Sequence, residues 1–157
     1  MKSILFAFAA STMLLVAPAH AQVRVSEPWV RATVPQQKAT GAFMRLNSPN
    51  NSKLVSASSP VAAIVEIHEM AMENDVMRMR QVAGVDLSAG KQTELKPGGF
   101  HIMLIDLKQQ VKEGDTVPLQ LVFQDAAGKR ETVDVKAPVR ALNAAATPAA
   151  QAGHSPH

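Results

Sequence analysis

Apolar and polar residues alternate over many short stretches of this chain. Between residues 100 and 105, Phe100, Ile102 and Leu104 form one apolar face, because side chains two apart in a strand lie on the same side. Clusters of turn-forming residues, such as Glu73 to Asp75, separate these stretches. No stretch has a convincing helical period. The pattern predicts eight or nine strands and an all-β fold, an antiparallel β-sandwich or barrel in one domain.

One pair of these stretches predicts a β-hairpin. Ala63 to Met72 reads as a strand, Glu73 to Asp75 as a turn, and Val76 to Val82 as the returning strand. Antiparallel pairing around that turn would bring His68 towards the region of Met79. The hairpin therefore joins residues that are separated in the sequence.

Side chains that can bind a metal ion are concentrated between residues 68 and 103. This segment holds two of the five histidines and five of the eight methionines. These residues are His68, Met70, Met72, Met77, Met79, His101 and Met103. Thioether sulfur is a soft, neutral donor that suits Cu(I), whereas zinc prefers thiolate, imidazole and carboxylate, and hard cations prefer oxygen. Neutral ligands also favour a monovalent ion where water is partly excluded. The segment predicts a Cu(I) site.

The order of these residues resembles a known pattern. The segment matches the H-x10-M-x21-H-x-M motif of the periplasmic copper chaperones called PCu(A)C. Ten residues separate His68 from Met79, twenty-one separate Met79 from His101, and one separates His101 from Met103. The similarity extends to the run EPWVRAT and to LKPGGFHIML, within residues 23 to 138. It implies a cupredoxin-like sandwich, which periodicity alone does not distinguish from an immunoglobulin-like one. It also implies four metal ligands: His68, Met79, His101 and Met103.

We also predict roles for four residues that are not part of this motif. Met70 stands near the first histidine and is a further candidate ligand. Met72 and Met77 fall outside the spacing, so we expect them in the core or on the surface. Trp29 is expected to pack in the core or at its rim rather than to cover the metal.

The resemblance implies that the protein binds Cu(I) and delivers it towards the CuA centre of cytochrome c oxidase. Delivery would go directly to subunit II of the oxidase or through a Sco-type thiol protein. Two alternatives stay open. The protein could sequester copper for resistance without a delivery partner, or it could be a β-sandwich interaction module whose methionines only pack.

The first 21 residues have the features of a secretory signal peptide. Lys2 provides a basic start, Ile4 to Val16 an apolar run of about 13 residues, and Ala21 ends a small-x-small cleavage site. A bilayer span needs about 20 residues. We expect cleavage after Ala21, a periplasmic location and no stable membrane insertion after signal removal. Cleavage after Ala19 is the alternative, and it would place His20 at the free amine as a different copper ligand.

The last 17 residues, 141–157, are alanine-rich and interrupted by proline, which predicts a disordered tail after a copper-binding domain at residues 22–140. His154 and His157 in this tail permit two interpretations. They could form a weak Cu(II) site, since imidazole and backbone nitrogen suit that ion, or they could be incidental residues of a solvated tail.

Composition excludes several classes of protein. The chain has no cysteine, which excludes disulfides, iron–sulfur clusters, zinc ribbons and blue-copper electron transfer. The net charge is +3 with acidic and basic residues interspersed, and only six residues are aromatic, so no nucleic-acid surface is expected.

The residue four after His68 is Met72, so the chain has no H-E-x-x-H motif there. A Glu66–His68 acid–base pair has no supporting constellation, and we predict that the protein is not an enzyme.

Overall fold

The computed structural model describes residues 22–143, and within this range the chain forms ten strands and no helix. The strands are β1 (Arg24–Arg31), β2 (Ala39–Asn47), β3 (Ser52–Ser58), β4 (Ala62–Glu73), β5 (Val76–Gln81), β6 (Val85–Leu87), β7 (Gln92–Leu95), β8 (Phe100–Leu107), β9 (Thr116–Asp125) and β10 (Arg130–Arg140). The predicted all-β class is confirmed. Within the described range no helix could span a membrane.

The predicted signal peptide and most of the predicted tail, residues 144–157, lie outside the described residues. The domain boundaries after residues 21 and 140 therefore stay predictions, although β10 ends at Arg140.

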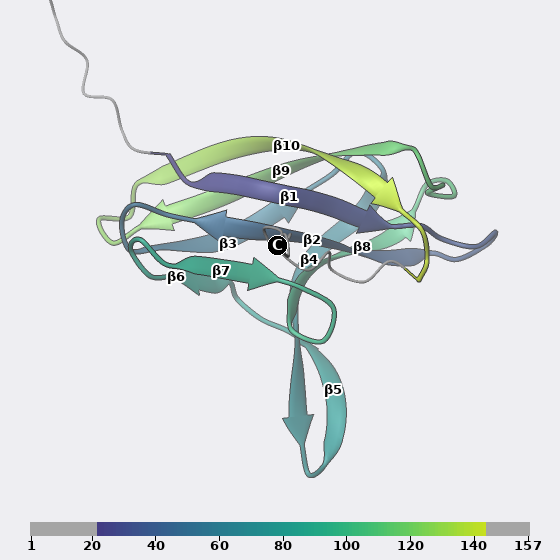
Figure 1. The fold of residues 1–157 in the computed structure, drawn as a ribbon, viewed down its shortest axis with the longest axis horizontal. Coiled ribbons are helices and arrows are strands. Elements are labelled where there is room, and N and C mark those ends of the chain that lie inside the picture. Colours follow the sequence, from purple (N-terminus) through teal and green to yellow (C-terminus); the bar gives the residue numbers. More distant parts are fainter. Residues whose placement is uncertain (1–21, 144–157) are drawn as a thin grey trace, which may run out of the picture.

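The strands follow one another in the order β5-β4-β8-β2-β1-β10-β9-β3-β6, and β7 pairs with β2 outside this path. All pairings are antiparallel except β1 with β10, which are parallel. That short pairing, Val30 with Val139 and Arg31 with Arg140, joins the two halves of the sheet. The halves lie in layers over one another (Figure 1).

Both halves contribute to one continuous hydrophobic core. Leu46 of β2 and Ile102 of β8 are fully buried, and so is Leu121 of β9. Met44 is only 2% exposed, and its thioether fills part of the core. Burying these side chains contributes about 25 cal/mol per Å² of apolar surface and is the main force that holds the layers together.

β1 contains a bulge that the sequence did not reveal. Pro28 lies inside β1, where the pairing with β2 shifts between Ser26 and Trp29. Glu27 has a positive φ of 49° at this point. A bulge accommodates a residue that cannot donate a backbone hydrogen bond. Beyond it Trp29 is 3% exposed, as expected for a packing residue.

The predicted hairpin is confirmed, and it projects from the body of the protein (Figure 1). β4 pairs with β8 as far as Glu69, whereas its pairing with β5 continues to Glu73. Beyond Glu69 the structure is therefore a two-stranded ribbon. Asn74 and Asp75 form its turn with φ values of 49° and 60°, and two positive values are what a type I′ turn requires.

Leu121→Ala tests the shared core. Leu121 is 0% exposed, so we expect its truncation to lower the free energy of unfolding by about 2–5 kcal/mol in urea denaturation. Leu142→Ala is the control, because Leu142 is 49% exposed. It should change stability by no more than about 0.5 kcal/mol. Equal effects of the two substitutions would contradict the assignment of Leu121 to the core.

Candidate metal centre

The pairing of β4 with β8 places two pairs of functional side chains next to one another. His68 lies opposite His101, and Glu66 lies opposite Met103. Residues directly opposite in antiparallel strands project from the same face, and residues two apart along a strand share that face. All four side chains therefore lie on one face of the sheet. Ile67 and Ile102, which form the pair between these two, point into the core.

The pairing of β4 with β5 adds the remaining predicted ligands to this face. Met70 lies two residues after His68 on β4, and Met79 lies opposite Met70 on β5. The hairpin thus brings the first histidine and the first methionine of the motif to the same side. The structure brings together all five predicted side chains of the site.

A cleft of about 290 Å³ opens at this place. It is lined by Arg31, Gly41, Phe43, Met70, Met79, Pro97, Gly98, His101 and Met103. His68 is not part of the lining. It lies beside the cleft, with its ring centroid 5.9 Å from that of His101.

A turn orients His101, which is 6% exposed. Its Nδ1–H donates a hydrogen bond to the Gly99 carbonyl oxygen over 3.1 Å, so the neutral ring keeps its lone pair on Nε2. Gly98 has a φ of +83°, which a glycine adopts without steric cost. The Pro97-Gly98-Gly99 turn therefore both lines the cleft and fixes the imidazole.

The environment of His101 keeps the ring neutral. Burial is the main cause that lowers its pKa below the usual 6.5. The hydrogen bond to Gly99 acts in the opposite direction, while His68 and Arg31 lower the pKa further. A neutral imidazole is the form that binds a metal ion, so His101 is available as a ligand at neutral pH.

The Glu66 side chain holds His68. Nε2 of His68 lies 2.7 Å from Glu66 Oε2. An ionised carboxylate only accepts, so Nε2 carries the proton in this contact, and a neutral ring has its lone pair on Nδ1. That Nδ1 is buried and finds no hydrogen-bond partner among the described residues. A buried unpaired nitrogen costs about 1–3 kcal/mol, and a bound metal ion would satisfy it.

The sulfur donors are less enclosed than the nitrogen donors. Met79 is 49% exposed, and Met70 and Met103 are half-buried. Within residues 22–143, no three His, Cys, Asp or Glu side chains lie close enough together to hold a metal ion. The cleft itself is lined by one imidazole and three thioethers, from His101, Met70, Met79 and Met103. Such a donor set favours Cu(I).

Two residues that shape the cleft were not found from the sequence. The Phe43 ring lies beside His101, with 6.2 Å between centroids. A Cβ on Gly41 would lie 2.7 Å from Cζ of Phe43, so only glycine leaves room for this ring. A glycine inside a strand often marks such a close approach, and Gly41 was the available signal.

Arg31 is a third lining residue that sequence analysis did not identify. Its guanidinium lies 5.4 Å from the Phe43 ring centroid and 6.0 Å from that of Trp29. Trp29 itself does not line the cleft, although its ring packs 4.5 Å from Phe43. Arg31 makes no ion pair with a carboxylate in the described part of the chain. It therefore adds positive charge beside the imidazole.

Residues 23–139 match the protein family described as "Putative lipoprotein LpqE-like". One curated relative is "Putative lipoprotein Lxx21020" of Leifsonia xyli subsp. xyli (strain CTCB07), 30% identical over 115 residues, which are 73% of this chain and 69% of the relative. Another is "Uncharacterized protein RP573" of Rickettsia prowazekii (strain Madrid E), 34% identical over 124 residues, which are 75% of this chain and 68% of that protein.

Solved structures with the same fold are copper-protein domains. The solution structure of CuI-DR1885 from Deinococcus radiodurans is 30% identical with a TM-score of 0.56, over 79% of this chain and 83% of that one. The apo PCuAC domain from PmoF1 is 25% identical with a TM-score of 0.61, over 76% of this chain and 93% of that one. These similarities confirm the predicted cupredoxin-like fold.

Arg31→Met tests the electrostatics of the cleft. Removing the cation should raise the pKa of His101 relative to wild type, but the pKa should stay below 6.5, because burial is the larger cause of the shift. Titration of the imidazole proton resonances by NMR in the metal-free protein measures this. Arg24→Met, at the other end of β1, is the control and should leave the pKa unchanged. An unchanged His101 pKa in Arg31→Met would contradict the assigned role.

Proposed function

The chain belongs to the LpqE-like, PCuAC-type family, and from that premise we propose that it is a copper chaperone that binds Cu(I) in the cleft between β4, β5 and β8. One observation carries the proposal. In a protein without a thiol, three thioethers and an imidazole line one cleft, and a second imidazole with an unpaired buried nitrogen lies beside it. This donor set is soft and neutral, which suits a monovalent soft ion.

The ligands that we propose are Nε2 of His101, Nδ1 of His68, and the sulfurs of Met79 and Met103. Their hydrogen bonds support the nitrogen assignment, because the other nitrogen of each ring already has an acceptor. Met70 supplies an additional thioether that can replace a leaving ligand. Hydrogen bonds of this kind fix ring orientation at metal sites.

The exposure of the sulfur donors supports transfer over sequestration. Met79 is half-exposed, whereas His101 is almost fully buried. A thiolate of an approaching protein can therefore displace the thioethers one at a time while the imidazoles still hold the ion. The recipients that we propose are subunit II of cytochrome c oxidase, at its CuA centre, and a Sco-type thiol protein.

We place this activity in the periplasm. The lipoprotein descriptions of the family and of the Leifsonia relative support a location outside the cytoplasm. The predicted signal peptide supports the same location. The Cu(II) site at His154 and His157 stays a prediction, because both residues lie outside the described part of the chain.

Met79→Leu and Met103→Leu test the ligand assignment. Leucine keeps approximately the volume of methionine but removes the sulfur, so the fold should persist. We expect each substitution to weaken Cu(I) binding about tenfold or more, which is roughly 1.4 kcal/mol, in competition with a chromophoric Cu(I) chelator. Met44→Leu is the matched control, because Met44 is a core thioether that is 2% exposed. Equal affinities for Cu(I) in all three variants would show that the sulfurs of Met79 and Met103 are not ligands.

A transfer experiment separates the chaperone from a sequestering protein. The full chain, loaded anaerobically with one equivalent of Cu(I), is mixed with the apo CuA domain of the oxidase or with a reduced Sco-type protein. We expect copper to move to the thiol protein, because thiolate is the stronger soft ligand. Retention of copper by the chain at equilibrium would favour sequestration instead.

A further inference from the structure

The end of the β4–β5 hairpin carries a second pair of thioethers that the proposed site does not use. Met72 lies opposite Met77, one same-face position beyond the pair formed by Met70 and Met79. Met72 is 63% exposed and Met77 is 44% exposed, so both belong to the surface and not to the core. Directly opposite residues have Cβ atoms about 4.5–5.5 Å apart, which lets both sulfurs reach one ion.

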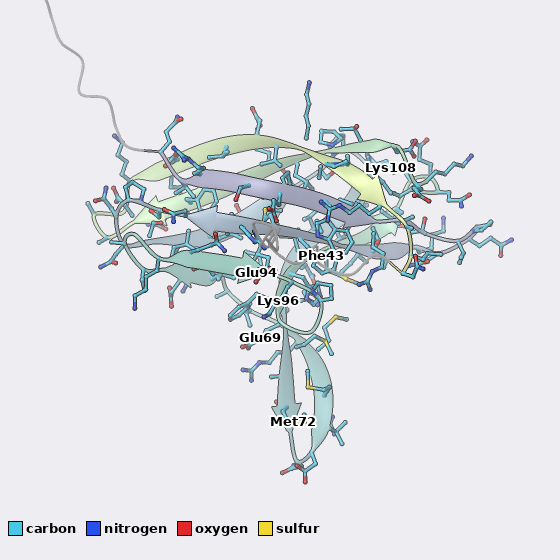
Figure 2. All side chains as sticks on the ribbon, in the orientation of Figure 1. Phe43, Glu69, Met72, Glu94, Lys96 and Lys108 are labelled. Carbon is cyan, nitrogen blue, oxygen red and sulfur yellow. The ribbon has the colours of Figure 1, made fainter. Side chains whose placement is uncertain are left out.

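On one face of the ribbon, Met72 and Met77 lie outside the hydrophobic core and are not among the residues packed against it. Its other face carries ion pairs, with Arg80 lying 2.9 Å from Glu69 and Arg78 lying 3.7 Å from Glu73. Figure 2 shows Met72 near the end of the projecting hairpin, Glu69 nearer the body, and sulfur atoms gathered along one side of the hairpin. One face of the ribbon thus carries ion pairs, and the other carries the exposed thioethers of Met72 and Met77.

The thioether face carries a row of neutral side chains, in which the four methionines are soft donors. From the turn towards the body, the same-face pairs are Met72 with Met77, Met70 with Met79, and His68 with Gln81. Each of these side chains is uncharged when the histidine is neutral. Neutral soft ligands select a monovalent soft cation over Ca²⁺, Mg²⁺ or Zn²⁺.

We propose that Met72 and Met77 form an outer Cu(I) site, from which the ion passes to and from the inner cleft. The inference rests on the proposed function and adds a second copper site to it. Two thioethers hold the ion more weakly than the inner ligands, and a ligand from solvent or from the partner completes the coordination. Passage is ligand exchange without electron transfer: the sulfurs of Met70 and Met79 bind as those of Met72 and Met77 leave.

The experiment titrates the full chain with Ag(I), a monovalent d¹⁰ ion that resists oxidation, and follows isotope-labelled methionine methyl groups by NMR. The first equivalent should shift the methyl resonances of Met79 and Met103. The second should shift those of Met72 and Met77. The methyl resonance of Met44, buried in the core, should stay unchanged throughout and is the internal control.

The double variant Met72→Leu/Met77→Leu keeps the apolar surface and removes the outer sulfurs. It should lose binding of the second equivalent, keep that of the first, and transfer Cu(I) to the thiol protein more slowly. Wild-type Met72 and Met77 resonances that do not move at the second equivalent would overturn the outer site. Slower transfer without such shifts would indicate a protein-docking role for the two methionines, and would also overturn it.

The two proposals fail in different ways. Shifts of Met79 and Met103 alone leave the inner site standing and overturn only the outer one. Shifts of Met72 and Met77 without those of Met79 and Met103 support the outer site and contradict the proposed function.

Discussion

The pairing register of β4 with β8 is the constraint on which both the core and the candidate site depend. Ile67 pairs with Ile102 in the core, and His68 pairs with His101 on the opposite face. Because side chains alternate along a strand, a slip of one residue would move the imidazole of one strand into the core and its paired isoleucine, Ile67 or Ile102, out of it. The burial of Ile102, which is 0% exposed, therefore also fixes the face that carries the candidate site.

The two kinds of candidate donor differ in their exposure to solvent. The imidazoles of His68 and His101 are buried and each is fixed by a hydrogen bond. The thioether of Met79 lies on the edge of the projecting ribbon and is half-exposed. In the proposed site, the two buried imidazoles would hold the ion, and the more exposed thioethers would be the ligands that a partner can replace.

Sequence analysis predicted the local parts of this account. The hairpin followed from alternation and from the turn at Glu73 to Asp75. Four of the five ligand candidates were implied by the resemblance to the PCu(A)C motif, and Met70 was added because it stands near the first histidine. Sequence analysis did not identify Gly41, Phe43 and Arg31 as cleft residues, because they reach His101 only through the pairing of β2 with β8 and of β1 with β2. The parallel contact of β1 with β10 depends on tertiary packing in the same way. Glu66 was considered beside His68 as part of an acid–base pair. That Glu66 orients the His68 ring is evident only from the 2.7 Å contact between Glu66 Oε2 and His68 Nε2.

X-ray absorption at the copper edge identifies the atoms that bind the ion. The full chain is loaded anaerobically with one equivalent of Cu(I), and the first coordination shell is measured in wild type and in the double variant Met79→Leu/Met103→Leu. The account predicts a shell of nitrogen and sulfur in wild type and a loss of sulfur in the variant. A shell of nitrogen or oxygen alone in wild type would contradict it, because copper would then bind without the thioethers of the cleft.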